Sequence, residues 1–215
     1  MTQGSVDMID IQTIEQRIAN ARDWHGTPLG EAGDMSVRER AQMHAALGRT
    51  VRPAGVLVLL VEREGGLSVV LTQRTAHLHD HAGQISFPGG RMDEGDIDIV
   101  ATALREANEE IGADAAQIQV VGVLPNYITV TAYEVTPVVA RSRPQAFAAD
   151  PFEVADVFEV PLTHILDDAN WRRDSFLRFG QRREYWAVPW QERYIWGATA
   201  GMLRTFRDVL WREVA

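Results

Sequence analysis

A cluster of three glutamates constrains this chain more than any other feature of its sequence. Residues 105–112 read Arg-Glu-Ala-Asn-Glu-Glu-Ile-Gly. On a helix, Glu106, Glu109 and Glu110 stand at positions i, i+3 and i+4, so their carboxylates share one face. The surrounding pattern predicts that this helix runs over residues 98–111.

The same helix has a second face that is apolar. Gly112 follows the last helical residue and is typical of the C′ position that ends a helix. The apolar stripe consists of Val100, Ala103, Leu104, Ala107 and Ile111. We therefore expect one face to anchor the helix to a core, while the other presents about three negative charges to one point.

The three like charges favour a metal site. At these spacings they slightly destabilise an isolated helix. A divalent cation would neutralise them, and Mg²⁺ takes oxygen ligands while keeping waters and substrate phosphates in its shell. A solvated acidic face is the alternative explanation. The preceding segment favours the cation, because Gly89 and Gly90 allow a tight turn or a close approach to a ligand.

Short β-branched runs predict a sheet around this helix. Residues 55–61 and 67–71 are typical of a hairpin with a glycine-containing loop. Further strand candidates are residues 85–87, 120–124, 132–140, 155–160 and, more weakly, 173–179 and 183–188. A final helix is predicted over residues 198–212. Strands mixed with a few helices favour an α/β (α+β) sandwich with a mixed β-sheet.

The chain is predicted to form a single domain with an N-terminal helical arm over residues 1–50. Ile11, Ile14 and Ile18 recur at helical spacing and give one apolar face. A second short helix is expected after Ser36, which would act as its N-cap with Glu39 at capping-box spacing. The catalytic domain is then expected over residues 51–215.

Charge and composition exclude several classes of function. The net charge is −9, which disfavours binding to nucleic acid. All 21 basic residues are arginines, so a Schiff-base or P-loop lysine is excluded. The absence of cysteine excludes disulfides and thiolate metal sites. The longest apolar run, residues 56–61, is far shorter than the ~20 residues of a membrane span. With no secretion signal evident, we expect a cytoplasmic protein without membrane partners.

The glycine-rich segment and the helix together resemble the Nudix box, G-x5-E-x7-R-E-U-x-E-E-x-G-U, in which U is aliphatic. Gly90 leads and Asp96 stands where the first glutamate is expected. Arg105, Glu106, Ala107, Glu109, Glu110, Gly112 and Ala113 follow in register. The box is one residue longer than the pattern, and both aliphatic positions are alanine. The resemblance implies a Nudix-type α/β/α sandwich and a structural ion pair between Arg105 and Asp96 or Asp93.

The flanks resemble the coenzyme A pyrophosphatase branch of the Nudix hydrolases. Residues 71–90 are similar to its signature, which has an L-T-x-R-S start, an L-R-x-H-x-G-Q middle and an F-P-G-G end. Thr75 replaces the usual serine, and His79 stands where an arginine is expected. Similar stretches downstream extend the resemblance to about residues 50–212.

The resemblance implies an enzyme that hydrolyses the pyrophosphate of coenzyme A, or of acyl-coenzyme A, to 3′,5′-ADP and 4′-phosphopantetheine. Mg²⁺ or Mn²⁺ would be held by Glu106 and Glu110, helped by Glu109. Glu109 is the first candidate for the base and Glu153 the second. The catalytic set is thus Glu109, Glu106 and Arg105.

Substrate contacts are expected from Arg74, His81, Gly89, Gly90 and Arg91, with Arg74 reading the 3′-phosphate. Trp186, Trp190 and Trp196 could stack an adenine, although core packing is the stronger expectation. A hydrolase of ADP-ribose or other nucleoside diphosphate derivatives, and a non-catalytic nucleotide-sensing module, remain alternatives. A homodimer is compatible with the sequence.

Overall fold

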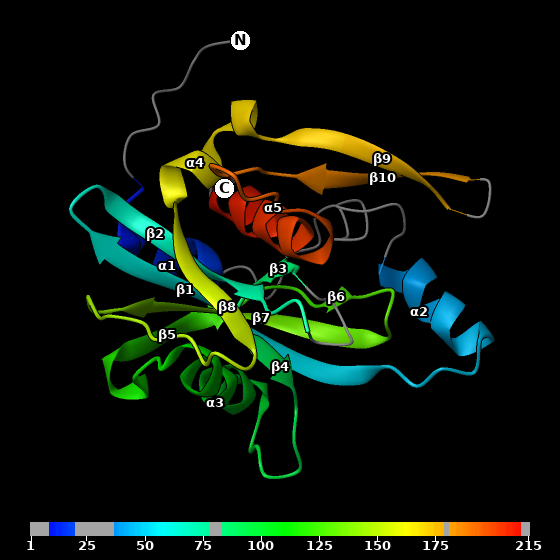
Figure 1. The fold of residues 1–215 in the computed structure, drawn as a ribbon, viewed down its shortest axis with the longest axis horizontal. Coiled ribbons are helices and arrows are strands. Elements are labelled where there is room, and N and C mark those ends of the chain that lie inside the picture. Colours follow the sequence, from blue (N-terminus) through cyan, green and yellow to red (C-terminus); the bar gives the residue numbers. More distant parts are fainter. Residues whose placement is uncertain (1–8, 20–36, 78–82, 179–180, 212–215) are drawn as a thin grey trace.

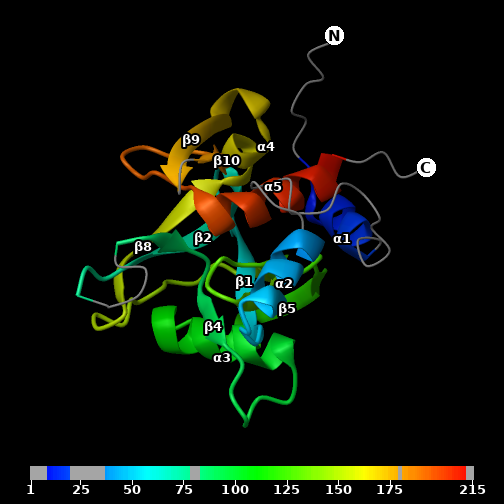
Figure 2. The same ribbon diagram turned by 90° about the vertical axis from the view of Figure 1, so that its right-hand side faces the viewer.

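The computed structural model describes residues 9–19, 37–77, 83–178 and 181–211. In these ranges it shows the predicted sandwich, with a mixed sheet between helices (Figure 1). One face of the sheet carries α3 (Ile99–Ile111), and the other carries α1 (Ile11–Ala19) and α5 (Gly197–Trp211) (Figure 2). No helix in the described ranges is long and apolar enough to cross a membrane.

The sheet is organised around one long strand. β1 (Arg52–Arg63) runs parallel to β7 (Tyr133–Ser142) over its length. Its other edge is shared by β2 (Gly66–Arg74), which pairs near the end of β1, and β4 (Gly89–Arg91), which pairs near its start. The other named pairings are antiparallel, so the sheet is mixed.

Shorter elements complete the sandwich. The remaining strands of the sheet are β3 (Ile85–Ser86), β5 (Ile118–Val123), β6 (Tyr127–Ile128) and β8 (Val154–Pro161). β9 (Arg172–Arg178) and β10 (Gln181–Ala187) form a separate hairpin that contacts α5. The short helices are α2 (Val37–Ala46), α4 (Leu162–Leu166) and the 3₁₀ turns η3 (Ala115–Gln117) and η4 (Asp168–Asn170).

β1 builds the core on both faces of the sheet. Its apolar run is fully buried, and successive side chains of a strand point to opposite faces. Leu57 and Leu59 therefore pack with Ala103 and Ala107 of α3, whereas Val58 and Leu60 pack in the cluster that contains α5. The continuous apolar run of β1 is the pattern expected of a strand buried on both sides.

Most predicted elements are present with shifted ends. The hairpin turn is shorter than expected, because β1 continues to Arg63 and β2 begins at Gly66. The last two predicted strands correspond to β9 and β10, and the last helix to α5. Ser36, the expected N-cap, lies outside the described residues.

Two local predictions differ from the structure. Gly89 and Gly90 were expected to allow a tight turn or a close approach to a ligand, and the structure has no turn there: they form β4 and pair with Val56 and Gly55. Ala132 was expected to begin a strand, but its φ is +66°, and β7 begins at the next residue. The pairing of β4 with β1 joins segments far apart in the chain, which a local pattern does not contain.

The first helix of the N-terminal arm belongs to the core. Ile14 and Ile18 of α1 are buried, and α1 packs on β5 and α5. The contact with β5 requires a glycine, because a Cβ on Gly122 would lie 2.8 Å from the Ile18 side chain. The arm therefore contributes to the stability of the sandwich.

We predict that Ile14→Ala lowers the free energy of unfolding by about 2–5 kcal/mol, because it removes a buried side chain and leaves a cavity. Gln16→Ala is the matched control, since Gln16 is exposed on the same helix. Urea unfolding of both variants measures the difference. Equal midpoints for the two variants would show that α1 does not support the core.

Candidate active site

The carboxylate helix is defined at both ends by its own sequence. The Asp98 side chain caps α3 by accepting a hydrogen bond from the Ala101 amide at 2.8 Å. Gly112 ends the helix with a φ of +64°, and its amide donates to the Asn108 carbonyl. The helix thus begins one residue later than predicted and ends at the predicted residue.

Arg105 and Asp96 form a two-pronged ion pair. The Arg105 Nε and Nη2 atoms donate to the two carboxylate oxygens of Asp96, each at 2.9 Å. Asp93, the other expected partner, lies at 3.8 Å from Nη2. Asp96 also accepts from the Thr102 hydroxyl at 2.9 Å. Arg105 is the main cause of a pKa of Asp96 held below its usual range.

Because the pKa of Asp96 is lowered in the fold, the pair stabilises the protein above the ordinary pKa of 3.8. This contribution is lost as the pH falls below 3.8 towards the lowered value. We predict that the unfolding free energy of wild type is higher than that of Asp96→Asn, and that this difference is largest at about pH 6.

Below pH 3.8 the unfolding free energies of wild type and Asp96→Asn should approach each other as the pH falls. Denaturant unfolding between about pH 6 and pH 3 measures this, and Asp93→Asn serves as the exposed, weakly paired control. A difference between wild type and Asp96→Asn that stays constant over this range would contradict the assignment.

The three glutamates do not converge as expected. Glu109 lies along the outer edge of α3, with its side chain 58% exposed and paired to Arg105 Nη1 at 2.9 Å. Glu106 also contacts Arg105, at 3.0 Å from Nη2, but is largely buried. The separation has a geometric cause, because residues 109 and 110 are about 100° apart around a helix whereas 106 and 110 are about 40° apart.

Glu110 is the most buried carboxylate of the site. It is 3% exposed and accepts a hydrogen bond from the Gly89 amide at 3.1 Å. Arg74 Nη1 lies 3.5 Å from its other oxygen. Burial raises the pKa of Glu110 to about 7, although the Gly89 amide and Arg74 act in the opposite direction.

Glu106 and Glu110 lie against the backbone of β4. A Cβ on Gly90 would lie 2.6 Å from the Glu106 carboxylate, and one on Gly89 would lie 2.4 Å from the Gly55 carbonyl oxygen. Gly89 also has a φ of +148°, which disfavours any other residue. The two glycines therefore let their own strand, β4, lie directly over the carboxylates.

We predict that Gly90→Ala weakens Mn²⁺ binding on the order of 10- to 100-fold with little loss of stability. The three atoms nearest to the added methyl belong to the carboxyl group at the end of the Glu106 side chain, which would have to move from its place beside Glu110 while the backbone stays. Gly95→Ala is the control, because no atom lies within 4 Å of its added Cβ. Calorimetric titration measures both, and equal affinities would contradict the role given to Gly90.

Glu153 adds negative charge to the pair from another part of the chain. It lies in the turn just before β8, and its charge contributes to raised pKa values of both Glu106 and Glu110, although burial is the larger cause. Glu153 was the second candidate for the base. No local pattern predicted its position, because the loop before β8 is irregular.

The donor set suits a hard divalent cation. Within the described residues, no three His, Cys, Asp or Glu side chains form a ready metal cluster. Glu106 and Glu110 nevertheless supply carboxylate oxygens, and Mg²⁺ commonly binds one or two carboxylates while waters and substrate phosphates fill its shell. Burial is the main cause of the raised pKa of Glu110, and a bound cation would stabilise its charged form.

The expected substrate residues are only partly assembled. Arg74 lies at the carboxylates, and its Nε is buried without a hydrogen-bond partner among the described residues. Arg91 is exposed and lies 3.9 Å from Asp93. His81 lies outside the described residues. His77 is exposed and packs on the ring of Phe152, 5.1 Å between centroids.

The three tryptophans considered for adenine stacking differ in their surroundings. Trp186 packs edge-on against Trp171, and Trp190 lies 4.7 Å from the His164 ring. These two support the core, which was the stronger expectation. Trp196 is 39% exposed.

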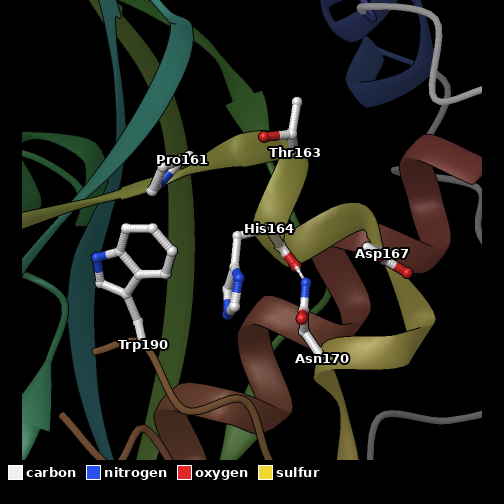
Figure 3. A pocket seen from close by; sticks show the side chains of 6 residues that line it. All are labelled: Pro161, Thr163, His164, Asp167, Asn170 and Trp190. Atoms are coloured by element: carbon white, nitrogen blue, oxygen red, sulfur yellow. Dashed lines mark hydrogen bonds between the residues drawn. The ribbon is translucent and has the colours of Figure 1, made fainter. Parts of the chain in front are cut away.

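A shallow hollow lies at the opposite end of β8 from Glu153 (Figure 3). Its lining consists of Pro161, Thr163, His164, Asp167, Asn170 and Trp190. The His164 ring is hydrogen-bonded to the Pro189 carbonyl at 2.8 Å, and the Asn170 amide donates to the His164 carbonyl. These polar groups are used within the fold, so the chemistry is assigned to the carboxylates.

Known proteins share this region of the chain. The family model described as NUDIX domain matches residues 51–179. Curated relatives called "Uncharacterized Nudix hydrolase NudL", from Escherichia coli O7:K1 (strain IAI39 / ExPEC) and Shigella boydii serotype 18, are 41% identical over 155 residues. The alignments cover 71% of this chain and 80% of each relative.

Solved structures resemble it more distantly. The Nudix hydrolase RenU from M. Smegmatis is 24% identical, with a TM-score of 0.43 over 52% of this chain and 71% of that one. The NUDIX domain of Shewanella oneidensis NrtR, solved with ADP ribose, is 23% identical, with a TM-score of 0.44 over 61% and 87% of the two chains. The segment matched by the family model contains all the carboxylates described above.

Proposed function

Because the chain belongs to the Nudix hydrolase family, we propose that it is a metal-dependent diphosphatase of coenzyme A and its acyl thioesters. The products would be 3′,5′-ADP and 4′-phosphopantetheine. The observation that carries this proposal concerns residues 71–90, which resemble the coenzyme A branch. Two residues near opposite ends of this segment contact the Glu110 carboxylate: Arg74 through its guanidinium group and Gly89 through its amide.

Glu106 and Glu110 would hold Mg²⁺ or Mn²⁺. The bound metal would polarise the phosphoryl oxygens and lower the pKa of a coordinated water. The Gly89 amide orients one oxygen of Glu110, and Arg105 fixes Glu106 from the outer side. The protein thereby supplies a site in which two buried carboxylates have restricted positions.

The geometry favours Glu153 over Glu109 as the proton acceptor. Glu109 is paired with Arg105 at the exposed edge of the helix. Glu153 instead acts on both Glu106 and Glu110 through its charge, and the loop that carries it is hydrogen-bonded to α3 from the Asp150 amide to the Glu110 carbonyl. A base must lie within hydrogen-bonding reach of the attacking water, directly or through one further water.

The place of Arg74 favours a contact with the diphosphate itself. A guanidinium 3.5 Å from Glu110 lies beside the proposed metal, where the scissile phosphates would bind. Its buried Nε, which has no hydrogen-bond partner among the residues that the structure describes, is a donor suited to a phosphate oxygen. This differs from the 3′-phosphate contact expected from the sequence.

A substrate panel tests the proposal. We predict that kcat/KM is higher for coenzyme A than for ADP-ribose, and that Glu110→Gln abolishes hydrolysis of both. Arg74→Ala should lower kcat/KM by roughly 10- to 150-fold, because a hydrogen bond to a charged group contributes about 1.5–3 kcal/mol. The loss should be similar for coenzyme A and 3′-dephospho-coenzyme A.

Two outcomes would contradict these assignments separately. Faster turnover of ADP-ribose would show that the substrate is another nucleoside diphosphate derivative. If Arg74→Ala lowers kcat/KM for coenzyme A but not for 3′-dephospho-coenzyme A, Arg74 contacts the 3′-phosphate. Binding of nucleotides without hydrolysis of any of them would instead indicate a sensing module.

A further inference from the structure

The loop before β8 is attached to the turn of α3 that carries Glu110. The Asp150 amide donates to the Glu110 carbonyl at 2.9 Å, and the Ala148 amide donates to the Ile111 carbonyl at 3.0 Å. These carbonyls belong to the last turn of the helix, where no partner within the helix is available. The loop therefore keeps a defined position relative to the carboxylates.

A β-bulge then selects which residue of the loop faces β2. Gln73 pairs with Asp156 but Arg74 pairs with Val154, so Ala155 is the extra residue of β8. Bulges of this kind change the direction of the residues beyond them. As a result, the amide of Thr75 donates to the Glu153 carbonyl at 3.0 Å.

Thr75 holds the loop with its side chain as well. Its hydroxyl donates to the Phe152 carbonyl at 2.9 Å, and the residue is 7% exposed. The hydroxyl is on the buried Thr75, so this part-buried bond restricts the backbone at Phe152 and Glu153. Thr75 is also where the chain departs from the serine of the related signature, and the departure keeps the hydroxyl.

We propose that Thr75 is a positioning residue, whose two hydrogen bonds to the 152–153 backbone hold the loop that carries Glu153 against the turn of α3 that carries Glu110. The proposal deepens the proposed function and rests on it. Arg74, the last residue of β2, approaches Glu110, and the next residue, Thr75, holds the loop that carries Glu153. Glu153 would strengthen cation binding through its charge.

A double-mutant cycle on Mn²⁺ affinity tests this, with the purified full-length chain and calorimetric titration. We predict that Thr75→Val weakens Mn²⁺ binding about 10-fold or more, since partners of metal-site residues typically contribute 10- to 100-fold. Thr75→Ser should stay within about 3-fold of wild type, because it restores the hydroxyl. In a Glu153→Gln background, Thr75→Val should cost less than about 3-fold further.

Thr72→Val is the matched control. Thr72 is buried on β2, and its hydroxyl is hydrogen-bonded to Ser86 rather than to the loop. The Mn²⁺ affinity of the Thr72→Val variant should therefore equal that of wild type. Melting temperatures verify that each variant folds, and Thr75→Ala replaces Thr75→Val if the latter does not. Equal losses from the Thr75 substitution with and without Glu153 would overturn the proposal, as would wild-type affinity in a folded Thr75→Val.

The two proposals fail in different ways. Mn²⁺ affinity requires no substrate, so the cycle can succeed even if coenzyme A is not hydrolysed. If coenzyme A is hydrolysed but the effects of Thr75→Val and Glu153→Gln on Mn²⁺ affinity are additive, the proposed function stands and the positioning role of Thr75 is wrong.

Discussion

Negative charge is concentrated on α3 beyond what the neighbouring cations compensate, and the site is arranged around this imbalance. Arg105, on the outer side of the helix, forms ion pairs with Asp96, Glu106 and Glu109. On the inner side, the partners of the Glu110 carboxylate among the described residues are the Gly89 amide and a more distant Arg74. Asp96 and Glu109 are therefore held by the fold, while the Glu110 carboxylate keeps negative charge that attracts a cation.

Small residues make this arrangement sterically feasible. Gly55 lets the start of α3 lie on β1, since a Cβ there would lie 2.6 Å from the Ile99 carbonyl oxygen. Gly89 and Gly90 let β4 cross the carboxylates, and Ala103 and Ala107 bring the helix close to the sheet. The positions of the glutamates thus depend on backbones packed at distances that larger side chains would not allow.

Local signals in the sequence predicted most of the helix and its stop at Gly112. The resemblance to the Nudix box left the partner of Arg105 open between Asp96 and Asp93, and the structure pairs it with Asp96, a residue close along the chain. The features that escaped prediction join distant segments: β4 on β1, the bulge at Ala155 and the approach of Glu153. The separation of Glu109 from Glu110 also depended on Arg105, which competes for one glutamate and not the other.

The segment that defines the family is smaller than the unit that folds. The family match ends at residue 179, yet α5 lies beyond it and α1 lies before it, and both helices contribute to the core on one face of the sheet. A fragment cut to the matched residues would keep every carboxylate of the proposed site while losing the buried side chains Ile14, Ile18, Leu203 and Phe206 from that core. The proposed chemistry and part of the core are therefore encoded in different parts of this chain, and the boundaries of the one do not give the boundaries of the other.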